Sequence, residues 1–277
     1  MKEFFLDLLI LVVSMVVLRI NKIAGSICVF IFFANLILRY RPYYYMLKAN
    51  KSYAAGKKDE ALSFYKKASG FKSSSDSIKI TYGFLLLKMG HLDEADKMLS
   101  DMLSIKKMAP RDKYKAKMSY ALVLWKKDRL DEAIELLYEV YDNYKNITLY
   151  ETLGFLLIIK GDFEKAVKFN EEAYDYDKND VVILDNLGQN YYLLGENEKA
   201  FQIYKTLHEK NPQFPEAYYN YGLVLLKMGE NEKALENMER ALKYTFTCLS
   251  TVTKEEVENK ISEVSKKSEP ESDDKIE

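Results

Sequence analysis

The sequence predicts an all-α protein, a solenoid of about six helix pairs preceded by a hairpin of two apolar helices. Three observations lead to this prediction. Glycine and proline are scarce, at 11 and 5 of 277 residues, which favours long helices over a β-rich fold. A six-residue motif returns at nearly constant spacing through most of the chain, and two apolar runs precede it.

The two apolar runs, residues 4–20 and 23–39, are separated only by Asn21 and Lys22. Each run is about 17 residues long, the short end of the range for a helix that spans a bilayer. Arginines stand at the ends of the runs and tyrosines follow the second, as at a membrane interface. We therefore expect residues 1–41 to be a transmembrane helical hairpin in a lipid bilayer. The alternatives are a cleaved signal peptide and two buried helices of a soluble domain.

Polar residues of the hairpin refine this expectation. Asp7 lies near the start of the first run and is interpreted as an interfacial carboxylate. Asn35 is expected to hydrogen-bond across the hairpin, to Ser14. Basic residues are in larger excess outside the turn than within it, so both ends of the hairpin are predicted to face the cytoplasm at the plasma membrane.

The repeated motif reads GENEKA at Gly195–Ala200 and again at Gly229–Ala234, with four looser copies. The glycine is expected to end one helix at positive φ, the acidic residues to begin the next, and the alanine to allow close packing. The closing alanines are spaced by 34, 38, 33, 34 and 34 residues, and the longest step indicates a loop at Ile105–Lys113. The alanines are Ala61, Ala95, Ala133, Ala166, Ala200 and Ala234.

The apolar spacing between these motifs resembles the tetratricopeptide-repeat (TPR) family, whose signature reads W-x2-L-G-x2-Y, then A-x3-F, then P. The best unit has Leu184 in the tryptophan position, followed by Leu187, Gly188, Tyr191, Ala200, Tyr204 and Pro212. The resemblance implies a right-handed solenoid over residues 42–247. Pro42 lacks a backbone N–H and suits the first turn of a new helix, so it is expected to separate the hairpin from the repeats. That first unit is degenerate: it keeps Tyr45, Ala49, Ala61, Tyr65 and Ala68.

The periodicity stops after Tyr244. Residues 248–267 are predicted to be a capping helix with Val257, Ile261 and Val264 on one face, because the apolar end of a solenoid needs a cover with a polar outer side. Residues 268–277 have almost no apolar content and are predicted to be a disordered acidic tail.

No arrangement of residues indicates catalysis. His91 and His208 lack neighbours at metal-ligand spacing and are interpreted as surface residues, and Cys28 and Cys248 as small buried hydrophobes. The sequence has no P-loop, dinucleotide fingerprint or nucleophile elbow. A net charge of −1 gives no reason to expect nucleic acid as a partner. We therefore predict a non-enzymatic protein without a cofactor.

The resemblance also implies a concave groove, lined by the first helix of each pair, in which peptides or partner helices bind. Helical spacing then assigns a candidate groove face to Ile80, Phe84, Leu87, Met118, Leu122, Trp125, Phe155, Ile158, Gln189, Tyr192, Tyr219 and Leu223, and also to Glu151, Asp185 and Leu226. Its apolar middle favours an amphipathic helix as occupant. The alternatives are that these residues are interhelical core, or are covered by the chain's own last helix.

Together these observations predict a membrane-anchored TPR scaffold that binds another protein or peptide through its groove. Asn186 and Asn220 match a carboxylate clamp of some family members, but the basic residues of that clamp are missing, so it is not predicted. Two alternative functions remain open. One is a structural or assembly subunit of a membrane or cell-envelope complex, in which the hairpin makes the main contacts. The other is an outward-facing repeat domain that serves envelope assembly.

Overall fold

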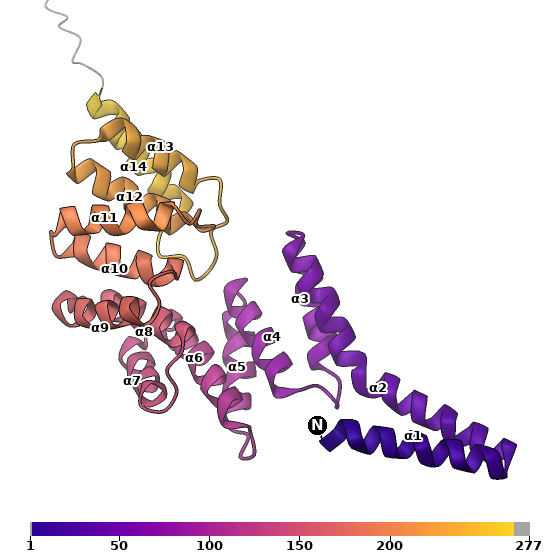
Figure 1. The fold of residues 1–277 in the computed structure, drawn as a ribbon. Helices are drawn as coiled ribbons and strands as arrows, with labels where there is room; N and C mark the ends of the chain where they lie inside the picture. The colour runs from indigo at the N-terminus through magenta and orange to yellow at the C-terminus, as the bar shows by residue number, and fades with distance from the viewer. Residues whose placement is uncertain (1, 269–277) are drawn as a thin grey trace, which may run out of the picture. The chain divides into compact units, whose positions relative to one another are not determined.

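The computed structural model describes residues 2–268, which form fourteen helices and no strand (Figure 1). The chain divides into two units, residues 1–82 and 83–277, and the boundary falls within α4 (Asp76–Lys88). The first unit also contains α1 (Lys2–Ile20), α2 (Lys22–Ala54) and α3 (Lys58–Ser69). The second continues with α5 (Leu92–Leu103), α6 (Pro110–Lys126), α7 (Leu130–Tyr141), α8 (Ile147–Lys160), α9 (Phe163–Tyr176), α10 (Val181–Leu193), α11 (Asn197–His208), α12 (Pro215–Lys227), α13 (Asn231–Ala241) and α14 (Lys254–Ser268).

A helical hairpin forms at the start of the chain from α1 and α2. The side chain of Asn21 caps α2 by accepting hydrogen bonds from the backbone N–H groups of Ile23 and Ala24, both at 3.1 Å. The two backbones approach closely at Gly25, where an added Cβ would lie 2.0 Å from the Cα of Leu18. A residue without a side chain at this point is therefore what lets the helices meet.

The polar contacts within this hairpin differ from the predicted one. The predicted hydrogen bond between Asn35 and Ser14 is wrong, because each side chain bonds a carbonyl four residues earlier in its own helix. Asn35 donates to the carbonyl of Ile31 at 3.0 Å, and Ser14 to that of Ile10 at 2.8 Å. These bonds satisfy both polar groups locally and leave no need for a partner across the hairpin.

The second helix does not end at the proline, so the prediction that Pro42 begins a new helix is wrong. α2 runs without interruption from Lys22 to Ala54, with Pro42 buried inside it. A proline cannot donate to the carbonyl four residues before it, here that of Leu38. The hydroxyl of Ser73 donates to that carbonyl instead, at 3.2 Å. A side chain from a distant part of the sequence thus replaces the hydrogen bond that the proline removes.

The last turns of α2 pair with α3, where the sequence predicts the degenerate first repeat. Ala49, Ala61 and Ala68 are fully buried, and 6% of Tyr65 is exposed. Five further helix pairs follow, and each contacts the next: α4/α5, which meet where Gly83 faces Leu99, and α6/α7, α8/α9, α10/α11 and α12/α13. The residues of the predicted packing positions therefore do form the core.

The joints between paired helices confirm the chemistry predicted for the repeated motif. The glycines lie at φ between 76° and 86°, and Asp128 takes the same role at φ 59° where the motif lacks a glycine. Every closing alanine is fully buried. The loop at the 38-residue step is shorter than predicted, because Pro110 opens α6 at a position where a missing N–H costs nothing.

The C-terminal helix α14 begins at Lys254, later than the predicted start at residue 248. The hydroxyl of Thr253 accepts from the N–H of Glu256 at 3.1 Å, and the Glu256 carboxylate accepts from the N–H of Thr253 at 2.6 Å. This reciprocal capping box fixes where the helix starts. Val257 is fully buried and α14 packs against α13. The capping role of α14 and the domain boundaries stay predictions, and the predicted tail lies almost entirely outside the described residues.

Candidate protein-binding face

The twelve residues predicted to line a groove fall into two groups. Ile80, Leu87, Met118 and Ile158 are at most 4% exposed, so they are interhelical core and present no surface to a partner. The other eight are half-buried, with part of each side chain open to the outside. They are Phe84, Leu122, Trp125, Phe155, Gln189, Tyr192, Tyr219 and Leu223.

The aromatic centre of this face joins α6 to α8. The ring centroids of Trp125 and Phe155 lie 4.8 Å apart in an edge-to-face arrangement. The Lys126 ammonium lies 3.8 Å from the centroid of the Trp125 ring, a cation–π contact. Burial lowers the pKa of Lys126, and the nearby Cys248 opposes that shift. The centre of the face therefore combines apolar rings with one partly desolvated cation.

Carboxyl groups lie on the helices that continue this face. Burial, and then the charge of Asp180, raise the pKa of Glu151 in α8 to about 7. Burial, and then the charge of Glu216, raise the pKa of Asp185 in α10 to about 7. Both groups therefore change charge near neutral pH, which neither the composition nor the motif spacing of the sequence indicates.

Hydrogen bonds from neighbouring helices hold the Asp185 carboxyl group and the backbone beside the Glu151 side chain. Asp185 accepts from the hydroxyl of Tyr204 at 3.0 Å and from the amide of Asn220 at 3.3 Å. The amide of Asn186 donates to the Glu151 carbonyl at 2.9 Å. The asparagines that match the clamp of other family members therefore cross-link helices of this chain.

The far end of the predicted face lies beside the C-terminal segment. Tyr192, Tyr219 and Leu223 pack against an apolar cluster that includes Val252 and Val257. Burial raises the pKa of Tyr219, and the charge of Glu256 in α14 adds to that effect. The end of the predicted face at Tyr219 therefore lies near α14, and cover by this helix, one alternative drawn from the sequence, stays a prediction.

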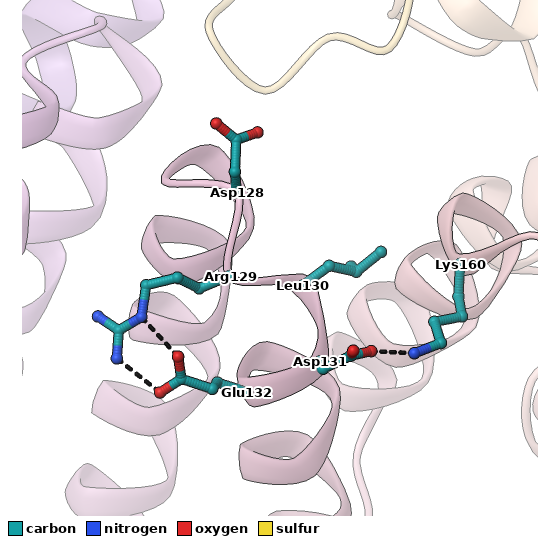
Figure 2. Close-up of a pocket in the computed structure, with 6 residues that line it drawn as sticks. All are labelled: Asp128, Arg129, Leu130, Asp131, Glu132 and Lys160. Atoms are coloured by element: carbon teal, nitrogen blue, oxygen red, sulfur yellow. Dashed lines mark hydrogen bonds and ion pairs between the residues drawn. The ribbon is translucent and has the colours of Figure 1, made fainter.

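A shallow depression of about 400 Å³ lies at the turn between α6 and α7 and the end of α8 (Figure 2). Arg129 donates to both carboxylate oxygens of Glu132, at 2.7 and 2.6 Å, and Lys160 pairs with Asp131. Figure 2 shows the Asp128 side chain turned away from both ion pairs. Four of the five charged groups here form two ion pairs, and none of the predicted groove residues lines this depression.

The two histidines differ in their surroundings. The side chain of His91 is 45% exposed, as predicted for a surface residue. His208 is not a surface residue: it lies against Tyr218 and Tyr221, with ring centroids 4.7 and 4.5 Å away. Its Nε2 atom lies 3.2 Å from the carbonyl of Ala217, and burial lowers its pKa. Within residues 2–268, no group of three or more His, Cys, Asp or Glu side chains is placed to hold a metal ion.

Solved structures of repeat proteins resemble this fold. A tetratricopeptide repeat protein from Parabacteroides merdae superposes with a TM-score of 0.64 at 13% identity, over 94% of this chain and 98% of the other. The pilF protein of Pseudomonas aeruginosa gives 0.56 at 15% identity, over 81% and 99%. PilW, described as a widely conserved type IV pilus biogenesis factor, gives 0.58 at 13% identity, over 72% and 91%. At these identities the likeness concerns the fold alone.

Family models match most of the second unit. A model described as TPR repeat matches residues 188–229, and models described as tetratricopeptide repeat match residues 85–146, 147–180 and 215–247. No curated protein sequence matches the chain. The matched segments cover more than half of the chain and coincide with the helix pairs and joints described above. The chain therefore belongs to the tetratricopeptide repeat family.

Proposed function

We propose that this chain is a membrane-attached, non-catalytic TPR scaffold that holds another protein against its half-buried aromatic face. The observation that carries the attachment is the apolar surface of α1 and α2. Large apolar side chains there are 43–82% exposed: Phe5, Leu8, Leu9, Ile10, Val12, Val13, Met15, Val16, Ile20, Ile23, Ile27, Phe30, Ile31, Phe33, Ile37 and Leu38. A continuous apolar surface of this extent needs a cover, and lipid is one that suits two adjacent helices.

The two helices support this proposal to different degrees. α2 is the one described helix that is long and apolar enough to cross a membrane, and only 6% of its most apolar window is buried. α1 has 19 residues and also carries Asp7. We propose that α1 crosses beside α2, because Arg39 pairs with Asp7 and thereby lowers the cost of placing either charge near lipid.

The proposed partner site is the half-buried part of the predicted face, centred on Trp125 and Phe155. Partly exposed aromatic rings beside a cation supply both apolar area and a directional contact, which are the usual anchors of a protein interface. Burying such area contributes about 25 cal/mol per Å² before the costs of ordering. TPR proteins in general bind other proteins or peptides, which agrees with this assignment.

Alkaline extraction of membranes tests the attachment. We expect the full chain to remain in the membrane pellet, and its appearance in the soluble fraction would contradict the proposal.

Protease added to intact cells then reports on which side of the membrane the repeats lie. We expect the repeats to be protected in the cytoplasm, whereas their digestion would favour the outward-facing alternative. Exchanging residues 1–41 for an unrelated hairpin distinguishes an anchor from an assembly subunit. If the hairpin is only an anchor, the protein should keep its function after the exchange. If the hairpin makes the main contacts of a complex, the function should be lost.

Crosslinking in native membranes, followed by identification of what is captured, tests the partner site. The double variant Trp125→Ala/Phe155→Ala should lose the captured protein. The matched variant Lys205→Ala/Glu239→Ala, on exposed positions of α11 and α13, should keep it. If both variants keep their helical circular dichroism and capture the same protein, the face is not the partner site.

A further inference from the structure

The connection between α13 and α14 is the longest one between helices of the second unit. Figure 1 shows it swinging away from both helices before it returns to α14. Its two ends are fixed: Tyr244 stacks on Tyr218 with ring centroids 5.0 Å apart, and Thr253 caps α14. We call the residues between these fixed ends, Thr245–Val252, the strap.

The strap contacts helices far from its own place in the sequence. The N–H of Cys248 donates to the carbonyl of Lys88 at 3.3 Å. Lys88 is the last residue of α4, and a helix does not satisfy its own last carbonyls. The N–H of Thr251 donates to a carboxylate oxygen of Glu216, in the first turn of α12, at 3.1 Å. The strap therefore connects the first and the last of the five helix pairs of the second unit.

The middle of the strap lies beside the aromatic centre of the predicted face. Cys248 of the strap lies near the Lys126 ammonium of α6. Lys126 in turn lies over the ring of Trp125. The strap thus occupies the neighbourhood of the side chains that the proposed function assigns to a partner.

The strap is shaped by its own hydroxyl groups. The N–H of Thr247 donates to the Ser250 hydroxyl at 3.1 Å, and the N–H of Leu249 donates to the Thr247 hydroxyl at 3.2 Å. The N–H of Ser250 donates to the carbonyl of Thr247 at 3.1 Å. These bonds make a tight turn that places Cys248 at its tip, next to α4.

The attachment of the strap is weaker than that of α14. Val252 is its one deeply buried apolar side chain, at 7% exposure, and Phe246, Cys248 and Leu249 are half-buried. Local opening is favoured where few contacts tie a segment to the rest of the fold. Here these are the N–H bonds of Cys248 and Thr251 and the packing of Val252 and Phe246. The strap can therefore leave the face while Tyr244 and α14 keep their places.

We propose that the strap is a built-in occupant of the predicted face, which a partner must displace. The partner that fits is an extended segment of another protein. Such a segment would donate backbone N–H groups to the Lys88 carbonyl and the Glu216 carboxylate, and would place a small apolar side chain beside Lys126. The displacement step rests on the proposed function. The closed position of the strap does not.

Thiol labelling of the full chain tests the closed position. In the variant Cys28→Ser, Cys248 is the sole cysteine and reports the strap directly. We expect its reaction with a maleimide to be at least about tenfold slower than that of a free peptide of residues 245–252. Equal rates would overturn the proposal. Slow labelling that is lost on dilution would also overturn it, because the strap would then lie on a second copy.

Two variants in the Cys28→Ser chain open the strap. Val252→Asp places a charge in the apolar cluster, and Glu216→Ala removes the acceptor of Thr251 without touching the core. Both should raise the labelling rate toward that of the free peptide. Thr245→Asp, at an exposed position, is the matched control and should leave it unchanged. Unchanged rates in a folded Glu216→Ala chain would overturn the proposal.

Binding in trans tests the displacement. A synthetic peptide of residues 245–252 with Cys248→Ser should bind the Val252→Asp chain, which keeps the Glu216 carboxylate, and not the chain with a closed strap. Equal binding to both would mean that the strap does not compete for the face. If crosslinking in membranes captures no partner while Cys248 still reacts slowly with the maleimide, the result counts against the proposed function and not against the closed position of the strap.

Discussion

The Arg39 guanidinium donates to both carboxylate oxygens of Asp7, at 3.0 and 3.1 Å, and so ties α2 to the start of α1. We expect Asp7→Ala to destabilise the hairpin by about 1 kcal/mol, because Arg39 loses its partner beside an apolar surface. The double variant Asp7→Ala/Arg39→Ala should cost less than the sum of the two single variants. Thermal unfolding of the detergent-solubilised chain gives the three values, and strictly additive costs would show that the pair contributes nothing.

The left-handed joint at Asp128 predicts a stabilising substitution. The other joints place glycine at positive φ, whereas Asp128 adopts φ 59° with a side chain. Asp128→Gly should therefore raise the free energy of unfolding by about 0.5–1 kcal/mol. Gly161→Ala should lower it by a similar amount, since its φ is 85° and an added Cβ meets no atom within 4 Å. Urea unfolding followed by Trp125 fluorescence measures both, and a destabilised Asp128→Gly chain would contradict the backbone argument.

The raised pKa values of Glu151 and Asp185, both about 7, predict a stability that falls as pH rises. Unfolded carboxyls titrate near pH 4, so around neutrality the folded chain holds protons that the unfolded chain has lost. The free energy of unfolding should therefore drop between about pH 4.5 and about pH 7, by at most about 1.4 kcal/mol per pH unit for each group. The lowered pKa of His208 acts in the opposite sense in the part of this range that lies below the unfolded imidazole's pKa of about 6.5.

Substitutions identify the groups responsible for that slope. Asp185→Asn and Glu151→Gln should each flatten it in denaturant unfolding at a series of pH values. Glu164→Gln, at an exposed position of α9, is the matched control and should leave it as it is. A slope that persists in the Asp185→Asn/Glu151→Gln chain would locate the titration elsewhere.

The hydrogen bond from Ser73 to the Leu38 carbonyl predicts coupling with Pro42. Ser73→Ala should cost about 0.5 kcal/mol, a small value because the bond is exposed. In a Pro42→Ala background the restored N–H bonds Leu38 itself, so Ser73→Ala should then cost almost nothing. Hydrogen exchange of the α2 amides that follow residue 42 measures the local opening in the four chains. Equal effects of Ser73→Ala in both backgrounds would refute the compensation.

Local chemistry explains what could be predicted from the sequence. The joints were predicted correctly because each of their effects acts within a few residues. These effects are a glycine at positive φ, acidic residues at a helix start and an alanine on the packed face. Pro42 was assigned wrongly because its compensation comes from Ser73, beyond the reach of any local pattern. The same holds for His208, which is enclosed by rings of the next helix pair.

Only part of the candidate face could be predicted from the sequence. Helical spacing places Phe155 and Ile158 on one side of α8, but it does not show how deeply each side chain is covered. Ile158 is 4% exposed, whereas Phe155 remains half-buried beside Trp125. The route of the strap depends on a contact between Cys248 and Lys88, which no periodicity encodes.

The uninterrupted course of α2 has a mechanical consequence. Its apolar first half and the turn that carries Ala49 belong to one continuous helix, with Pro42 inside it and no loop between them. A displacement of the apolar half is therefore carried to the turns of α2 that pack against α3 along a helix rather than through a flexible linker.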